Sequence, residues 1–222
     1  MSDSIATELL ALRDILPPET TEAWRRVVPL VPSGAYLSGG TALAVHLHHR
    51  SSRDLDFFTP QPFDADALSA RLLDAFDDFA PTLVDEGTVN GTLGGAKLQF
   101  LDASPQRILH RPDRRAGLLI AGVDDILATK VKVIGDRPAL RDYFDLMKIE
   151  EMTDLTVEEG FRLYVEKYEE GRPDPTRIGH LLAALGYLED VDDDPGVPAD
   201  KAVVEAYWHR RQPQIAKTLD LR

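Results

Sequence analysis

The chain has 222 residues, a formal net charge of −13 at pH 7 and no cysteine. A chain of this length can bury a core as one large domain or as a medium-sized domain with an appendage. The absence of cysteine excludes disulfides, thiolate metal sites and a cysteine nucleophile. The negative charge opposes nonspecific nucleic-acid binding by the surface as a whole.

No apolar run in the sequence is long enough to span a bilayer. The first residues, Met-Ser-Asp-Ser-Ile-Ala, provide neither the basic segment nor the apolar segment of a secretory signal. We therefore expect a cytoplasmic protein that does not enter a membrane.

The first 60 residues alternate predicted helices with two short strands. Pro17-Pro18 end the first helix, and Thr20 or Thr21 is expected to cap the second. Gly39-Gly40 turn the chain from a strand into a third helix. The elements expected here are helices over 5–15, 21–28 and 41–48 and strands over 35–38 and 54–59.

Between residues 60 and 121 the pattern predicts one amphipathic helix and three further strands. Asn90-Gly91 and Gly94-Gly95 lie between two of these strands and indicate a hairpin, with or without a bulge. The elements expected are a helix over 63–79 and strands over 82–85, 96–102 and 118–121.

The last hundred residues favour helices only, expected over 123–133, 138–151, 156–170, 175–188 and 200–218. Strands followed by helices indicate an α+β fold, in which a small mixed sheet flanked by helices precedes a C-terminal helical region. We expect one domain over 1–121 and the helical region over 122–222.

Asp54 and Asp56 are the first candidate site. Residues i and i+2 of a strand point to the same face, so their carboxylates would lie together while Leu55 and Phe57 face the core. Two neighbouring carboxylates stay ionised more easily beside a cation, and Mg²⁺ accepts one or two carboxylates together with substrate phosphates. An Asp-x-Asp pair on its own is equally consistent with solvated acids at a strand end.

The segment Ser38-Gly39-Gly40-Thr41 is the second candidate. Glycine permits positive φ and close backbone approach, and the N-terminus of the following helix presents N–H groups to an anion. A plain strand-to-helix turn uses the same residues. The order of glycine turn, helix, basic loop and Asp-x-Asp is more specific, and it predicts a site for a metal-bound nucleoside triphosphate.

Two segments are basic. The first, over 46–53, contains Arg50 and Arg53 and adjoins the acidic pair, so a functional role is favoured there. The second, over 107–115, is as consistent with a solvated loop as with a binding surface. Three histidines of the first segment could bind Zn²⁺, although a helix end that favours histidine explains them better. They are His46, His48 and His49.

These motifs resemble the AbiEii/AbiGii-type nucleotidyltransferase toxins, a branch of the polymerase-β-like nucleotidyltransferase superfamily. The resemblance begins with Gly39-Gly-Thr-Ala-Leu and His49-Arg-Ser-Ser-Arg-Asp-Leu-Asp-Phe-Phe. Two later segments extend it in the right order to about residue 150. They are Val123-Asp-Asp-Ile-Leu-Ala-Thr-Lys-Val and Arg137-Pro-Ala-Leu-Arg-Asp-Tyr-Phe-Asp-Leu.

The resemblance implies roles for individual residues. Asp54 and Asp56 would bind the catalytic Mg²⁺ or Mn²⁺, and the triphosphate would lie on the glycine turn. Lys130 would contact phosphate or nucleotide, and Asp142, with Asp145 as a further candidate, would complete the distal part of the site. The residues assigned to nucleotide binding are Ser38, Gly39, Gly40, Thr41, Arg50 and Arg53.

The residues of the two later segments support a plainer interpretation on their own. On this interpretation Lys130 is a solvated lysine, and Lys132 is an alternative candidate for the contact with phosphate or nucleotide. Arg141 and Asp145 are four residues apart and could pair across a helical turn, while Asp142 and Asp145 share a face.

Gln99 is the position at which this sequence departs from the superfamily pattern. Most catalytic members carry a third carboxylate on a strand after the Asp-x-Asp. In the strand predicted over 96–102, Gln99 occupies the place where that acid is expected, and Asp102 falls on the opposite face. The general base is therefore in question.

The leading hypothesis is a Mg²⁺-dependent nucleotidyltransferase that transfers a nucleotide from a nucleoside triphosphate to RNA, with tRNA as one candidate, or to a protein. It would be the toxin of a type IV toxin–antitoxin pair with a cognate antitoxin. One alternative is a catalytically degenerate module that binds nucleotide or a partner. Another is transfer to a small molecule, which an acidic pocket beside the site would favour because such acceptors are cationic.

Overall fold

The computed structural model describes residues 3–219. The chain divides into two compact units, Met1–Gly122 and Val123–Arg222. Within the described residues every strand belongs to the first unit. None of the described helices combines the length and apolar character that crossing a membrane requires. The predicted fold class, a mixed sheet with helices followed by a helical region, is confirmed.

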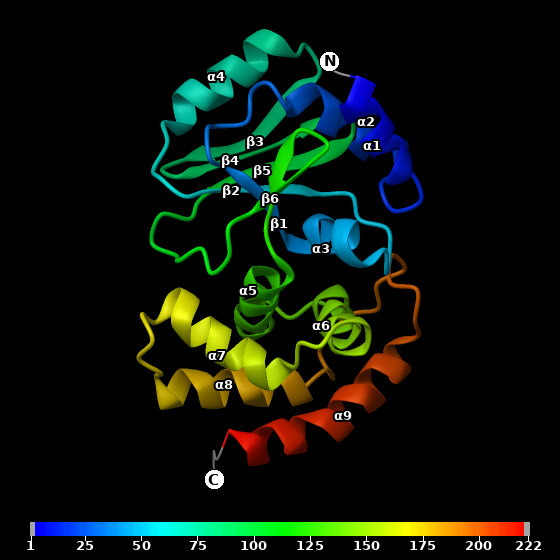
Figure 1. Cartoon of the computed structure of the whole chain (residues 1–222), viewed down its shortest axis with the longest axis vertical. Helices are drawn as coiled ribbons and strands as arrows, with labels where there is room; N and C mark the ends of the chain where they lie inside the picture. Colours follow the sequence, from blue (N-terminus) through cyan, green and yellow to red (C-terminus); the bar gives the residue numbers. More distant parts are fainter. Residues whose placement is uncertain (1–2, 220–222) are drawn as a thin grey trace. The chain divides into compact units, whose positions relative to one another are not determined.

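The first unit is built on a seven-stranded sheet with the order β3-β4-β5-β2-β1-β7-β6 (Figure 1). The central strand β2 pairs antiparallel with β1 and parallel with β5, so the sheet is mixed. Its strands are β1 (Tyr36–Ser38), β2 (Leu55–Thr59), β3 (Phe79–Asp85), β4 (Thr88–Leu93), β5 (Ala96–Asp102), β6 (Asp113–Arg115) and β7 (Leu118–Ile120).

Four helices flank this sheet: α1 (Asp3–Ala11), α2 (Pro18–Val27), α3 (Gly39–Leu47) and α4 (Ala65–Ala75). Figure 1 shows α1, α2 and α4 on one side of the sheet and α3 on the other. The sheet face toward α2 and α4 is apolar, and Leu55, Phe57 and Phe100 on it are fully buried. Phe57 and Phe100 stack with their ring centroids 4.9 Å apart.

The starts of two helices differ from prediction. Thr20 or Thr21 was expected to cap α2, but the helix begins at Pro18 with Pro17 at the N-cap. Proline suits the first helical position because its ring fixes φ and the missing N–H would be unpaired there. The helix expected over 63–79 is the shorter α4. The Asp64 carboxylate caps its start by accepting from the Ala67 N–H at 2.9 Å, and the extended conformation of Phe76 ends it.

The interpretation of Asn90-Gly91 as a hairpin turn was wrong. Both residues lie inside β4, where Asn90 pairs with Gln99 and Gly91 pairs with Leu98. A turn does lie at Gly94-Gly95, as predicted, and a second turn lies at Glu86-Gly87; all three of these glycines have positive φ. Sequence reasoning also missed β6, an exposed edge strand of three residues that pairs with β7.

The second unit contains only helices among the described residues, as predicted. They are α5 (Val123–Asp136), α6 (Leu140–Met152), α7 (Val157–Tyr168), α8 (Pro175–Gly186) and α9 (Lys201–Thr218). Trp208 of α9 is fully buried, and its indole N–H donates to the Tyr143 carbonyl at 3.1 Å. This bond ties the last helix to α6.

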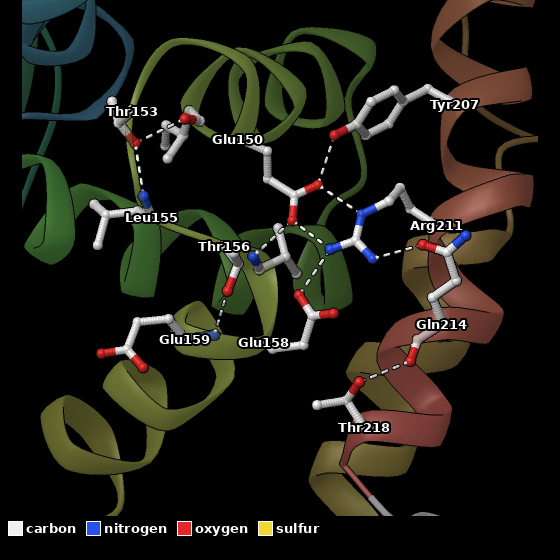
Figure 2. A network of polar contacts seen from close by, with 12 residues as sticks. Glu150, Thr153, Leu155, Thr156, Glu158, Glu159, Tyr207, Arg211, Gln214 and Thr218 are labelled. Carbon is white, nitrogen blue, oxygen red and sulfur yellow. Dashed lines mark hydrogen bonds and ion pairs between the residues drawn. The ribbon is translucent and has the colours of Figure 1, made fainter.

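A polar network also joins α6, α7 and α9 (Figure 2). The Glu150 carboxylate accepts from Arg211 at 2.6 and 3.1 Å and from the Tyr207 hydroxyl at 2.6 Å. Arg211 also donates to Glu158 at 2.7 Å. Burial opposes the charged form of Glu150, but the bonds from Arg211, Tyr207 and the Val157 N–H outweigh it and hold the Glu150 pKa below its ordinary value.

Candidate active site

The pairing of β1 with β2 places the glycine turn beside the acidic pair. Ser38, the last residue of β1, lies opposite Asp56. Along β2, Leu55 and Phe57 are fully buried on the core face, while Asp56 between them is half-buried on the other face. The predicted alternation is therefore confirmed, and it fixes the Asp56 carboxylate on a rigid strand. Asp54 directly precedes this strand and is also half-buried.

Gly39 lies against this carboxylate. Its φ of +68° lies in the left-handed region, where a side chain is strained. A Cβ atom at this position would also lie 2.7 Å from Oδ2 of Asp56. Both the backbone conformation and the space thus require glycine, because the Asp56 carboxylate rests against the first residue of α3.

The first turn of α3 suits an anion. Ser38 occupies the N-cap, yet its side chain makes no capping hydrogen bond. The N–H groups of the first turn therefore lack the partner that a capping serine usually supplies. They point outward from the positive end of the helix dipole, which is a favourable place for phosphate oxygens.

The Thr41 side chain is 1% exposed and hydrogen-bonded within the protein. Its hydroxyl donates to the Asp54 carbonyl and lies 2.8 Å from the Ser52 hydroxyl. These bonds clamp the start of α3 to the loop that leads into β2. Thr41 thereby positions the backbone of Asp54.

The two arginines of the basic loop lie in different environments. Arg50 is 9% exposed, and its Nη1 donates to the Ser51 carbonyl at 3.0 Å. Its Nη2 occupies the space that a Cβ of Gly40 would need, so the guanidinium lies against the first turn of α3. Arg53 is exposed, and its carbonyl accepts from the Thr20 hydroxyl at 3.0 Å. Arg50 is thus held at the N-terminal end of α3, whereas the Arg53 side chain lies toward solvent.

Gln99 lies where the sequence placed it. In the parallel pairing of β2 with β5 it is the direct neighbour of Asp56, and it is half-buried on the same face. A carboxylate at this position would adjoin the acidic pair. The neutral amide contributes no negative charge there.

The second unit brings Lys130 together with Asp142. The Lys130 ammonium lies 2.6 Å from Asp142 Oδ1 and 2.6 Å from Asp145 Oδ2. Lys130 is 5% exposed and Asp145 is fully buried, so the interpretation of Lys130 as a solvated lysine was wrong. Burial and the nearby Asp142 carboxylate raise the pKa of Tyr143 to about 12.

The structure also decides the two alternative assignments for this cluster, those of Lys132 and Arg141. Lys132 pairs with Asp136 on the surface at 2.5 Å. The alternative in which Arg141 pairs with Asp145 is wrong, because Arg141 Nη1 lies 3.6 Å from Asp194 and Asp145 pairs with Lys130.

A second buried ion pair was not foreseen. Lys167 of α7 donates to Asp125 of α5 at 2.6 Å, and both side chains are almost completely buried. Their positions are 42 residues apart in the chain, so no local pattern in the sequence could have paired them.

The histidines do not support a zinc site. His46 Nε2 lies 2.8 Å from the Ala121 carbonyl, and His48 ends α3 in the left-handed conformation. Within residues 3–219, His46, His48 and His49 do not bring their ring nitrogens together as a metal-ligand group.

Solved structures share this fold. MenT4, a nucleotidyltransferase toxin from Mycobacterium tuberculosis H37Rv, superposes with a TM-score of 0.60 at 18% identity, covering 96% of this chain and 88% of that one. JHP933 from Helicobacter pylori superposes with a TM-score of 0.55 at 19% identity, covering 99% and 95%. This chain thus shares its fold with these two proteins, one of which is a nucleotidyltransferase toxin.

The sequence places the chain within a family. The sequence model described as "Nucleotidyl transferase AbiEii toxin, Type IV TA system" matches residues 24–109, which contain the glycine turn, the acidic pair and Gln99. The uncharacterized protein aq_aa25 of Aquifex aeolicus (strain VF5) is 30% identical over 198 residues, which cover 87% of this chain and 90% of the relative. The chain belongs to the AbiEii family of type IV toxins and is a nucleotidyltransferase.

Proposed function

We propose that the protein is a Mg²⁺-dependent enzyme that transfers a nucleotide from a nucleoside triphosphate to an RNA, tRNA being one candidate, or to a protein. The observation that carries this proposal is the contact between Asp56 and Gly39. It joins a carboxylate on a rigid strand to the N-terminus of α3, so groups that bind a cation and groups that bind phosphate adjoin each other.

The residues fit a hard divalent cation. Asp54 and Asp56 offer carboxylate oxygens, the ligands that Mg²⁺ and Mn²⁺ prefer, and the chain contains no thiolate that could compete. Asp54 makes no ion pair with any residue in the described part of the chain. Its carboxylate is therefore not committed to a lysine or arginine of the protein. When bound, the cation would neutralise charge on the phosphates and on the departing pyrophosphate.

The protein groups supply binding and electrostatic stabilisation. The first N–H groups of α3 would hold phosphate oxygens, and Arg50 would add positive charge at the same helix end. An acceptor hydroxyl oxygen attacks the α-phosphorus, the bond to the β-phosphate oxygen breaks, and pyrophosphate leaves as the hydroxyl proton passes to solvent or a base. Lys130 and Asp142 enter this proposal through the family resemblance and their mutual ion pair.

A second candidate function rests on Gln99. A neutral amide cannot accept the hydroxyl proton as a carboxylate can, so a protein that binds nucleotide without turnover is the alternative. Calorimetry separates the two, because tight binding of triphosphate without release of pyrophosphate favours the alternative.

The proposal is tested with purified protein, Mg²⁺, each labelled nucleoside triphosphate and total RNA or protein extract. Label transfer is expected, and Asp54→Asn or Asp56→Asn should abolish it. Asp74→Asn, at an exposed carboxylate on α4, is the matched control and should leave transfer intact. No transfer together with no triphosphate binding by the wild type would refute the proposal.

Growth arrest on expression gives an independent test of the toxin role. The variant carrying both Asp54→Asn and Asp56→Asn should relieve the arrest, and persistent toxicity would show that the acidic pair is not its cause. A cognate antitoxin and action in the cytoplasm are parts of the same proposal. A small neighbouring open reading frame whose product suppresses the arrest would support the antitoxin.

A further inference from the structure

Helix α9 carries two apolar faces. The first holds it to the rest of the second unit through the buried side chains of Val204, Trp208 and Ile215. The second borders a groove of about 500 Å³ between α6 and α9. We call the apolar residues that α9 contributes to this groove, which recur at helical spacing, the outer stripe. They are Ala202, Val203, Ala206 and Tyr207.

The outer stripe is accessible to another molecule. Val203 is 54% exposed, and Ala202 and Ala206 are exposed as well. Figure 1 shows α9 along the outer edge of the second unit, in agreement with this exposure. The distance between two packed helices depends on the side chains at their contact, so the alanines allow a second helix to approach closely. The stripe therefore suits a helix as its partner.

Opposite charges lie at the two ends of the outer stripe. Asp200 is the N-cap of α9, and its exposed carboxylate makes no capping hydrogen bond. Arg210 is exposed about 15 Å farther along the helix axis, and its Cζ lies 5.8 Å from the Tyr207 ring centroid. Neither side chain makes an ion pair within residues 3–219. On the α6 side of the groove the charges are already matched, because Lys148 pairs with Glu151 at 2.6 Å.

We propose that the protein forms a homodimer in which α9 packs antiparallel against α9 of a second copy. A twofold interface uses the same surface on both copies, so that surface must be complementary to itself. The outer stripe meets this condition, because its apolar middle faces an apolar middle and each acidic end faces a basic end. The dimer does not depend on the proposed nucleotidyl transfer.

The spacing of the residues sets the register of this helix pair. With the twofold axis level with Glu205, Asp200 of each copy lies level with Arg210 of the other copy. Val203 then lies level with Tyr207 of the other copy. Glu205 itself points about 130° away from the outer stripe, so the two glutamates do not meet. A parallel pair would bring like charges together, and the charges therefore select the antiparallel direction.

Light scattering coupled to size-exclusion chromatography tests the dimer on the full chain. The buffer contains about 0.15 M salt, which screens the repulsion between two copies of net charge −13. Over a concentration series, the mass should rise toward twice the 24.6 kDa of one chain. Val203→Glu places a carboxylate from each copy in the apolar middle and should leave the protein monomeric. Leu73→Glu, at an apolar side chain of α4 that is 48% exposed, is the matched control and should keep the dimer.

Charge reversal tests the antiparallel register. Asp200→Lys and Arg210→Glu should each raise the dissociation constant of the dimer by about tenfold or more, because both ion pairs of the interface are replaced by repulsion. An equimolar mixture of the two variants should form heterodimers with the affinity of the wild type, since one copy then carries two basic ends and the other two acidic ends. A variant that fails to fold could not be rescued in this way.

Each outcome supports or overturns the dimer. A wild type that stays monomeric overturns it, and the outer stripe would then be left for a helix of another protein. A dimer that Val203→Glu does not disrupt forms through a different surface, which overturns the proposal as well. If circular dichroism shows both charge variants to be folded and their mixture still does not restore the dimer, the antiparallel register is refuted.

Discussion

Lys130→Met tests whether the buried cluster of the second unit serves catalysis, stability or both. Lys130 lies 2.6 Å from carboxylate oxygens of both Asp142 and Asp145, and Asp145 is fully buried. The substitution removes the cation and leaves buried carboxylate charge behind. Breaking a buried ion pair in this way costs about 3–5 kcal/mol. In a chain of 222 residues, 1 kcal/mol corresponds to about 2–4 °C, so the Tm should fall by about 6–20 °C.

Lys167→Met is the control that isolates catalysis. Its ion pair with Asp125 has the same 2.6 Å separation and is at least as deeply buried, so a comparable loss of Tm is expected. Thermal unfolding followed by circular dichroism measures both variants. Nucleotidyl transfer is then assayed well below either Tm, where Lys130→Met should be inactive and Lys167→Met active. A Tm of Lys130→Met within about 2 °C of the wild type would refute the energetic reasoning, and equal loss of transfer in both variants would refute the catalytic role.

Two further substitutions probe the glycine turn and the helical unit. Gly39→Ala and Gly95→Ala both place alanine at positive φ, with φ of +68° and +90°, and each should cost about 1–2 kcal/mol. Only the Gly39 variant displaces the Asp56 carboxylate, so only its transfer rate should fall, by about a hundredfold; equal rates would contradict this. Glu150→Gln should lower the free energy of unfolding by about 1.5–3 kcal/mol at pH 7. Glu159→Gln, at a more exposed ion pair, should lower it by about 0.5 kcal/mol or less. Because the folded pKa of Glu150 is lowered, its contribution is complete above the unfolded carboxyl pKa and disappears as the pH falls through the folded value. Urea unfolding measured from pH 7 to 3 should thus show the free energy of unfolding of the wild type approaching that of Glu150→Gln. A difference between the two proteins that stays constant with pH would contradict the role assigned to Glu150.

The strand–turn–helix–strand core of the site was predictable because its signals are local. Gly39-Gly40, the alternation around Asp56 and the helical periodicity each act over a few residues. The interpretation of Asn90-Gly91 as a turn failed because β4 pairs with a neighbouring strand on each side, β3 and β5, and this pairing outweighed the turn propensity of the two residues. A Cβ on Gly91 would lie 2.7 Å from the Phe79 ring, so this glycine serves close packing inside the sheet.

The burial of Lys130 and Lys167 was not predictable from periodicity for a related reason. Both lysines occupy helices whose apolar residues explain the packing, and a lysine on such a helix usually lies in solvent. Their carboxylate partners are 12 and 42 residues away in the chain. The ion pairs form only once α5, α6 and α7 pack together, so only the family resemblance pointed to Lys130 and nothing pointed to Lys167.

The contact between Asp56 and Gly39 has an electrostatic consequence for nucleotide binding. The carboxylate itself lies at the positive end of α3, so without a divalent cation it repels a triphosphate that approaches the same N–H groups. A cation held by the carboxylate reverses the sign of that effect. Asp56→Asn should therefore bind a triphosphate analogue about fivefold more tightly than the wild type in EDTA, and more weakly than the wild type in Mg²⁺. Asp74→Asn should follow the wild type in both conditions. Calorimetric titration in EDTA and in Mg²⁺ checks this reversal in the order of affinities. An Asp56→Asn variant that binds the analogue more weakly than the wild type in both conditions would show that the helix end and the carboxylate do not act on the same phosphates.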